Sequence, residues 1–235
     1  MLRKITALAM LVLCLLLQTS PASLRALYLE SDSFSLAPLP AGAVPIKAPI
    51  EADLNHEGSA EKLALVQGRL TIFSGGQSVW QSPAGWTVVQ AEFTELNKDG
   101  TPEVTLLVWR PFRPWPVDQW LPHAGRIASF QDAEGNSCQI ILIGWRGHEY
   151  GEIWAGSALA EPVKSFATAD LNADNIQELV TLEGSYGDSP SAPAHTLKVW
   201  GWNGFWFSVV SVMEGIFHKL ALVQANAGRI LILVP

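Results

Sequence analysis

Three short acidic segments of this chain carry side chains suited to a hard cation. They share a nine-position register, with oxygen-bearing side chains at positions 1, 3, 5 and 9 and Gly or Asn at position 6. Calcium takes six to eight oxygen ligands, and alternate positions of a tight loop can turn their side chains inward together. The segments therefore predict Ca²⁺ as a cofactor. The predicted ligands are Asp53, Asn55, Glu57 and Glu61 in loop 1; Glu95, Asn97, Asp99 and Glu103 in loop 2; and Asp170, Asn172, Asp174 and Glu178 in loop 3.

The three loops are not equal as ligand sets. Only loop 3 has Asp at both positions 1 and 5, whereas Glu57 and Glu95 are one methylene longer and move their carboxylates outward. Asn175 at position 6 of loop 3 is a sensible substitute for Gly, because Asn accepts a positive φ better than most residues. We expect loop 3 to bind calcium most tightly. The alternative is that all three are polar turns without a metal, since Asp, Asn and Gly also favour ordinary turns.

The pattern D-x-N-x-D-G-x-x-E-L resembles the FG-GAP or VCBS-type repeat of integrin-like β-propellers. Phe93 and Phe166 precede loops 2 and 3, as the pattern of that family wants. The resemblance covers about residues 46 to 235 and implies that each calcium loop joins the first and second strands of a blade. It implies no single task, because the repeat serves adhesion proteins, lectins, lyases and many other secreted proteins.

Apolar, strand-like runs give a count of repeats. Runs anchored at Leu63, Val104, Ile140, Leu179 and Ile230 are separated by 41, 36, 39 and 51 residues. Periods near forty with such runs favour propeller blades over helical repeats. The sequence therefore predicts an all-β fold, a five-bladed β-propeller, in which shorter turns at 132–136 and 226–228 replace the calcium loop in two repeats. A β-sandwich of similar strand spacing is the alternative.

The two ends of the chain are expected to close the ring. The segments 219–224 and 229–234 supply two strands, and 26–30 with 34–36 supply two more. Pairing them would complete the last blade and remove an exposed sheet edge. Residues 23–235 are thus predicted to form a single domain, with a Pro-rich linker segment at 37–49 inside it.

Residues 1–22 read as a signal peptide. Arg3 and Lys4 precede an apolar run at 5–17 that is short for a membrane span, and Ala22 fits a cleavage site. This predicts an extracellular, cell-surface or periplasmic protein whose mature domain is not inserted in a membrane; an uncleaved anchor is the alternative. The chain has 15 basic and 22 acidic residues and a net charge of −7, which argues against nucleic acid as a partner. We expect a monomer.

Ten tryptophans suggest a second kind of site. Most are expected in the core or between blades, because large aromatics favour strands. Trp115 and Trp120 belong to a Pro-rich connection that is expected to be exposed, where indoles can stack on sugar rings. No G-x-S-x-G or H-E-x-x-H motif occurs, and the five histidines are scattered, so we expect no enzyme.

The sequence thus predicts a secreted calcium-binding propeller that acts as a non-catalytic binding or scaffold module for a protein or glycan ligand. One alternative is a glycan-binding lectin that uses the Trp-rich loops. A second alternative is an enzyme that degrades an extracellular polymer.

Overall fold

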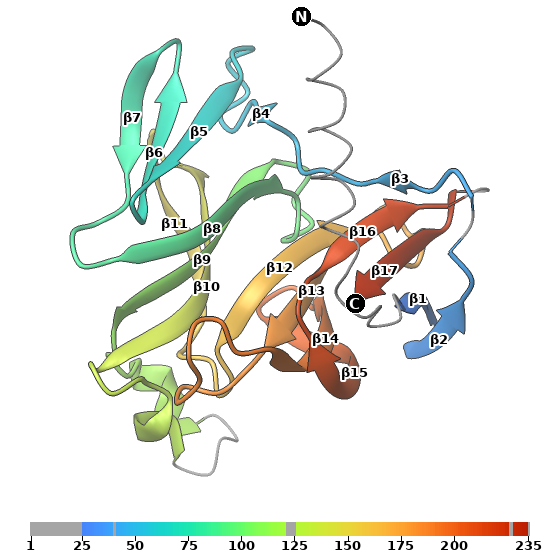
Figure 1. Ribbon diagram of the computed structural model, residues 1–235. Coiled ribbons are helices and arrows are strands. Elements are labelled where there is room, and N and C mark those ends of the chain that lie inside the picture. The colour runs from blue at the N-terminus through green and yellow to red at the C-terminus, as the bar shows by residue number, and fades with distance from the viewer. Residues whose placement is uncertain (1–24, 40, 121–125, 226–227, 235) are drawn as a thin grey trace, which may run out of the picture.

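The computed structural model describes residues 25–39, 41–120, 126–225 and 228–234. The predicted signal peptide, residues 1–22, lies outside this part of the chain. The described residues form four antiparallel sheets arranged in a ring, together with two short 3₁₀ helices, η1 (Pro116–Trp120) and η2 (Arg126–Ser129) (Figure 1). Within these residues no helix has the length and apolar character needed to cross a membrane.

The first three blades each contain four strands in chain order. Blade 1 consists of β4 (Glu51–Ala52), β5 (Glu61–Val66), β6 (Arg69–Ser74) and β7 (Gln77–Gln81). Blade 2 consists of β8 (Thr87–Thr94), β9 (Glu103–Pro111), β10 (Asn136–Arg146) and β11 (Glu149–Ala155). Blade 3 consists of β12 (Val163–Ala169), β13 (Glu178–Glu183), β14 (Ala194–Trp202) and β15 (Phe207–Phe217).

The fourth blade joins the two ends of the described chain. Its order is β16 (Ala221–Gln224), β17 (Ile230–Val234), β1 (Arg25–Glu30) and β2 (Ser33–Ala37), with β3 (Val44–Pro45) beside β16. Strands β1 and β17 are antiparallel, with Ala26 opposite Leu233. The expected pairing of N- and C-terminal strands is therefore present, and β3 lies within the predicted linker segment 37–49.

The predicted number of five blades is wrong, because the four sheets form a four-bladed propeller. Four of the five anchor residues lie on the second strand of a blade, but Ile140 lies on β10, the third strand of blade 2. An apolar run marks a strand covered on both faces, and β10 is buried from Ser137 to Gly144. The connection between β9 and β10 is long, residues 112–135, so Val104 and Ile140 are 36 residues apart although both belong to blade 2. This spacing is close to that of a repeat and led to the extra blade.

Three buried clusters join neighbouring blades. One packs blade 1 against blade 2 and includes Leu70 and Phe93, and a second packs blade 2 against blade 3 and includes Leu142 and Phe166. The third packs blade 3 against blade 4 through residues such as Val180 and Ile232. Burial of aliphatic and aromatic side chains stabilises by about 1.5–3 kcal/mol each, so these seams hold the ring together.

Aromatic side chains also bridge blades 2 and 3. Trp154 on β11 makes edge-on contacts with Trp202 and Phe207, at centroid distances of 5.6 and 5.1 Å, and its Nε1 donates to the Phe205 carbonyl. The expectation that tryptophans lie between blades is confirmed for Trp154 and Trp202.

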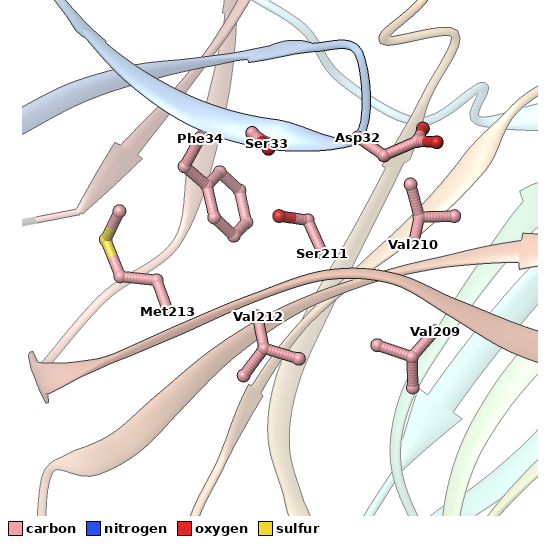
Figure 2. A pocket seen from close by; sticks show the side chains of 8 residues that line it. All are labelled: Asp32, Ser33, Phe34, Val209, Val210, Ser211, Val212 and Met213. Carbon is pink, nitrogen blue, oxygen red and sulfur yellow. The ribbon is translucent and has the colours of Figure 1, made fainter.

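A shallow hollow of about 390 Å³ lies between blades 3 and 4. Figure 2 shows Phe34 of β2 near Ser211 and Met213 of β15, with Asp32 at the turn above them. Among its lining residues Asp32 is the only titratable group, and Ser33 and Ser211 add two hydroxyls, so the hollow holds no cluster of titratable side chains.

Candidate functional site

The three acidic loops occupy the same place in three blades. Each begins at the residue after the first strand, and its position 9 is the first residue of the second strand: Glu61 of β5, Glu103 of β9 and Glu178 of β13. Positions 4 and 6 have positive φ in all three loops. The residues and angles are His56 (59°) and Gly58 (83°), Lys98 (63°) and Gly100 (79°), and Ala173 (65°) and Asn175 (66°).

The loops also share three hydrogen bonds from backbone N–H groups to side chains. In loop 3, Asn175 N donates to Asp170 Oδ2 at 2.8 Å, Asp174 N donates to Asn172 Oδ1 at 2.9 Å, and Leu171 N donates to Glu178 Oε2 at 2.8 Å. The equivalent bonds are present in loops 1 and 2. Polar side chains thus satisfy N–H groups that no strand partner can reach.

The glutamate at position 9 is buried in every loop, at 0% exposure for Glu61 and Glu103 and 5% for Glu178. Glu103 Oε1 accepts from Leu96 N at 2.7 Å and from Thr94 Oγ1 at 2.9 Å, whereas Oε2 is buried with no hydrogen-bond partner in the described structure. Burial raises the pKa of Glu103 to about 8, against the lowering effect of those two hydrogen bonds, and the neighbouring Glu95 and Asp99 raise it further. This oxygen needs a proton or a cation.

Loop 3 brings all four predicted ligands together. Asn172 Nδ2 lies 3.2 Å from Asp174 Oδ2 and 3.0 Å from Glu178 Oε1, and Asp174 N lies 3.1 Å from Asp170 Oδ1. Burial raises the pKa of Glu178 to about 7, and the charges of Asp174 and Asp170 raise it further. Asp170 and Asp174 thus disfavour the charged form of Glu178, and a divalent cation bound in the loop would offset that repulsion.

Loop 1 differs because a tyrosine from blade 2 enters it. Tyr150 on β11 donates its hydroxyl proton to Glu61 Oε1 at 2.9 Å and accepts from Asn55 Nδ2 at 2.9 Å. The second oxygen of Glu61 already accepts from Leu54 N. Both oxygens of the buried carboxylate are thus satisfied by protein groups, unlike those of Glu103.

The loops are neighbours at one end of the ring. His56 Nε2 of loop 1 lies 3.2 Å from Thr101 Oγ1 of loop 2, and Glu95 N of loop 2 donates to Gln177 Oε1 of loop 3 at 2.9 Å. Twelve predicted oxygen ligands are therefore gathered on one acidic face that spans blades 1 to 3.

The fit to calcium is partial. No group of three His, Cys, Asp or Glu side chains in the described part of the chain converges closely enough to hold a metal ion. Each loop would instead supply carboxylates, one amide oxygen and backbone carbonyls, with water completing the shell. The unpartnered, buried oxygens of Glu103 and Asp53 are the atoms that favour a cation.

The two tryptophans predicted to bind a ligand, Trp115 and Trp120, differ in their surroundings. Trp115 borders a cleft of about 520 Å³ and is 40% exposed, whereas Trp120, at the end of η1, is 79% exposed and lies outside the lining of that cleft. Three residues of these sites were not predicted: Trp86 and Arg110, which line the cleft beside Trp115, and Tyr150, which enters loop 1.

Strand order and ring arrangement define the class of this protein as an all-β, four-bladed β-propeller. No family model matches the chain, and no curated protein matches it. Among solved structures it is similar to a crystal structure of BBS1N in complex with ARL6DN soaked with mercury, with 12% identity, a TM-score of 0.27, and coverage of 81% of this chain and 66% of that chain. A second, soaked with lead, has 11% identity, a TM-score of 0.25 and coverage of 83% and 94%. The chain thus spans just under two thirds of the first structure, and likeness this low adds nothing to the assignment.

Proposed function

We propose that this protein is an exported, calcium-stabilised propeller of the FG-GAP or VCBS type that acts as a non-catalytic binding or scaffold module. Three of its four blades present the same loop between first and second strands, with the same positive-φ positions and the same side-chain to backbone hydrogen bonds. The export signal predicted at residues 1–22 agrees with a compartment in which calcium is abundant.

One observation carries the proposal. Glu103 Oε2 is fully buried at the end of loop 2 and has no hydrogen-bond partner in the described structure. An unpaired carboxylate oxygen in such a place costs free energy, and a bound cation removes that cost. Calcium is the cation that oxygen-only loops of this kind select.

The geometry also ranks the loops. Loop 3 gathers its four ligands, and loop 2 holds the unpartnered Glu103 oxygen, so both should bind calcium. Loop 1 should bind it most weakly, because the Tyr150 hydroxyl already occupies Glu61.

Thermal unfolding of the purified protein in calcium and in chelator tests the proposal. A ligand bound only by the folded state at a hundredfold excess over Kd stabilises by about 2.7 kcal/mol, which corresponds to about 5–10 °C in a protein of this size. Asp174→Ala should remove much of this calcium response. Glu57→Ala, at the same position of loop 1, should leave most of it.

Glu103→Gln gives an independent arm. The amide keeps an oxygen for Leu96 N–H but carries no charge, so the variant should be at least as stable as the wild type in chelator and less stabilised by calcium. If melting is the same in millimolar calcium and in chelator, the loops are turns only and the proposal fails.

A further inference from the structure

The cleft of about 520 Å³ lies on blade 2, away from the acidic loops. One wall is the β7–β8 turn with Pro83 and Trp86, and the other is the end of β9 and the connection after it, with Arg110 and Trp115. Because β8 and β9 are antiparallel, this end of the pair is opposite to loop 2, which joins their other ends. A ligand in the cleft would not compete with a cation in loop 2.

The cleft combines two indoles with two positive charges. The Arg110 guanidinium carbon lies 5.0 Å from the Trp86 ring centroid and 6.0 Å from that of Trp115, and Arg110 Nη1 is 3.7 Å from Glu152 Oε1. Arg113 also lines the cleft, is exposed, and forms no ion pair with another described residue. A negative charge on a ligand would therefore meet one guanidinium that is free to pair.

The wall that carries Trp115 is fixed to the blade before any ligand binds. Asp118, 2% exposed, accepts hydrogen bonds from Trp115 N and from Ser157 Oγ, which follows β11. Phe112 N donates to the Gly135 carbonyl at 2.8 Å and so ties the start of the same connection. A site held in place in this way loses little conformational entropy on binding.

We propose that this cleft binds a carboxylate-bearing saccharide, such as a uronic acid unit of an acidic polysaccharide. Indole faces accept the C–H faces of a sugar ring, and guanidinium groups pair with its carboxylate. The volume lies in the range of small-ligand sites, about 300–1,000 Å³. The walls carry Pro83, Pro111 and Pro114, which lack N–H groups, so a peptide strand has few donors with which to pair.

This inference names a ligand class for the binding module proposed above, and it rests on that proposal only for the module's role. Titration of the protein with trigalacturonate, followed by tryptophan fluorescence and calorimetry in chelator, is the test. Trigalacturonate should bind, and neutral maltotriose of the same ring number should not. Binding in chelator keeps the result separate from the calcium proposal, which melting experiments decide.

Variants locate the site. Trp115→Ala should weaken binding by about tenfold or more, and Arg113→Gln, which changes only an exposed side chain, should weaken it several-fold. Trp120→Ala is the matched control and should bind as the wild type does, because Trp120 is outside the cleft lining. No binding at millimolar trigalacturonate, an equal loss in Trp120→Ala, or displacement by an acidic proline-rich peptide that binds more tightly would each overturn the proposal.

Discussion

The hydroxyl of Tyr150 is expected to stabilise the fold by joining blade 2 to loop 1. It donates to Glu61 Oε1 and accepts from Asn55 Nδ2, both at 2.9 Å. Tyr150→Phe removes these two bonds but keeps the ring, which packs edge-on against Trp145 at a centroid distance of 4.8 Å and against the core shared by blades 1 and 2. The substitution therefore isolates the hydroxyl.

The magnitude follows from the burial of Glu61, whose exposure is 0%. Losing a hydrogen bond to a buried, charged group costs about 1.5–3 kcal/mol, so we expect the free energy of unfolding to fall by about 2 kcal/mol. For a chain of this size that lowers Tm by about 4–8 °C. Thermal and denaturant unfolding in chelator measure it.

Tyr28→Phe is the matched control. Tyr28 also donates its hydroxyl to a carboxylate, that of Glu30 at 3.1 Å, but this pair is exposed. The control should lose less than about 0.5 kcal/mol, because water replaces an exposed bond. Equal losses in Tyr150→Phe and Tyr28→Phe would refute the reasoning.

A second measurement asks what the hydroxyl does to loop 1. Without it, Glu61 Oε1 has lost its only side-chain donor among the described residues, so millimolar calcium should raise the Tm of Tyr150→Phe by more than it raises that of the wild type. A loss of stability with an unchanged calcium response would mean that loop 1 is not a cation site at all.

Two further changes test the core and the loops. Lys198→Met should lower the free energy of unfolding by about 3 kcal/mol, because Lys198 Nζ lies 2.6 Å from Glu183 Oε2 and the Glu183 side chain is only 2% exposed. Lys62→Met, the control, removes an exposed ion pair and should lower it by less than about 1 kcal/mol. Denaturant titration measures both. Gly100→Ala should lower the free energy of unfolding by about 1–2 kcal/mol because of its φ of 79°, since no atom lies within 4 Å of the added Cβ. Gly187→Ala is the control: its added Cβ is equally free of contacts and its φ is not positive, so the change should be nearly neutral. A similar loss in both variants would show that φ is not the cause.

Local pattern was enough to predict the loops and the terminal pairing. The register of polar positions placed each loop between two strands, and strand-like segments at both ends of the chain indicated strands that pair in one blade. The local pattern could not predict the number of blades, because Ile140 on a third strand is buried, as is Val104 on a second strand. An apolar run reports burial, not position within a blade.

The contacts that distinguish the loops and form the cleft depend on distant parts of the chain. Tyr150 is 89 residues from Glu61, so no local pattern indicates their bond. The pairing that forms the cleft could be predicted to within one residue. Loop 2 pairs Thr94 with Glu103, and an unbroken antiparallel register from there would pair Trp86 with Pro111. A bulge between Val88 and Gln90 shifts the register by one residue, so that Trp86 lies towards Arg110 instead.

The carboxylates of these loops have two possible roles: they accept hydrogen bonds from backbone N–H groups of the loop, and they can bind a cation. The carboxylate at position 9 uses one oxygen to accept a backbone N–H of the loop, and the carboxylate at position 1 uses one oxygen in loops 1 and 2 and both oxygens in loop 3. A metal-free turn needs these hydrogen bonds as well. The presence of acids at these positions therefore follows from the turn itself. What separates the loops is the second oxygen at position 9, which faces a tyrosine hydroxyl in Glu61, an amide in Glu178 and no partner in Glu103. If the loops are only turns, Glu103→Gln should stabilise the protein under all conditions, because it removes a buried carboxyl group that must either take up a proton or carry an uncompensated charge. If they hold calcium, the same substitution should stabilise in chelator and destabilise in calcium, so the change of sign identifies the ion.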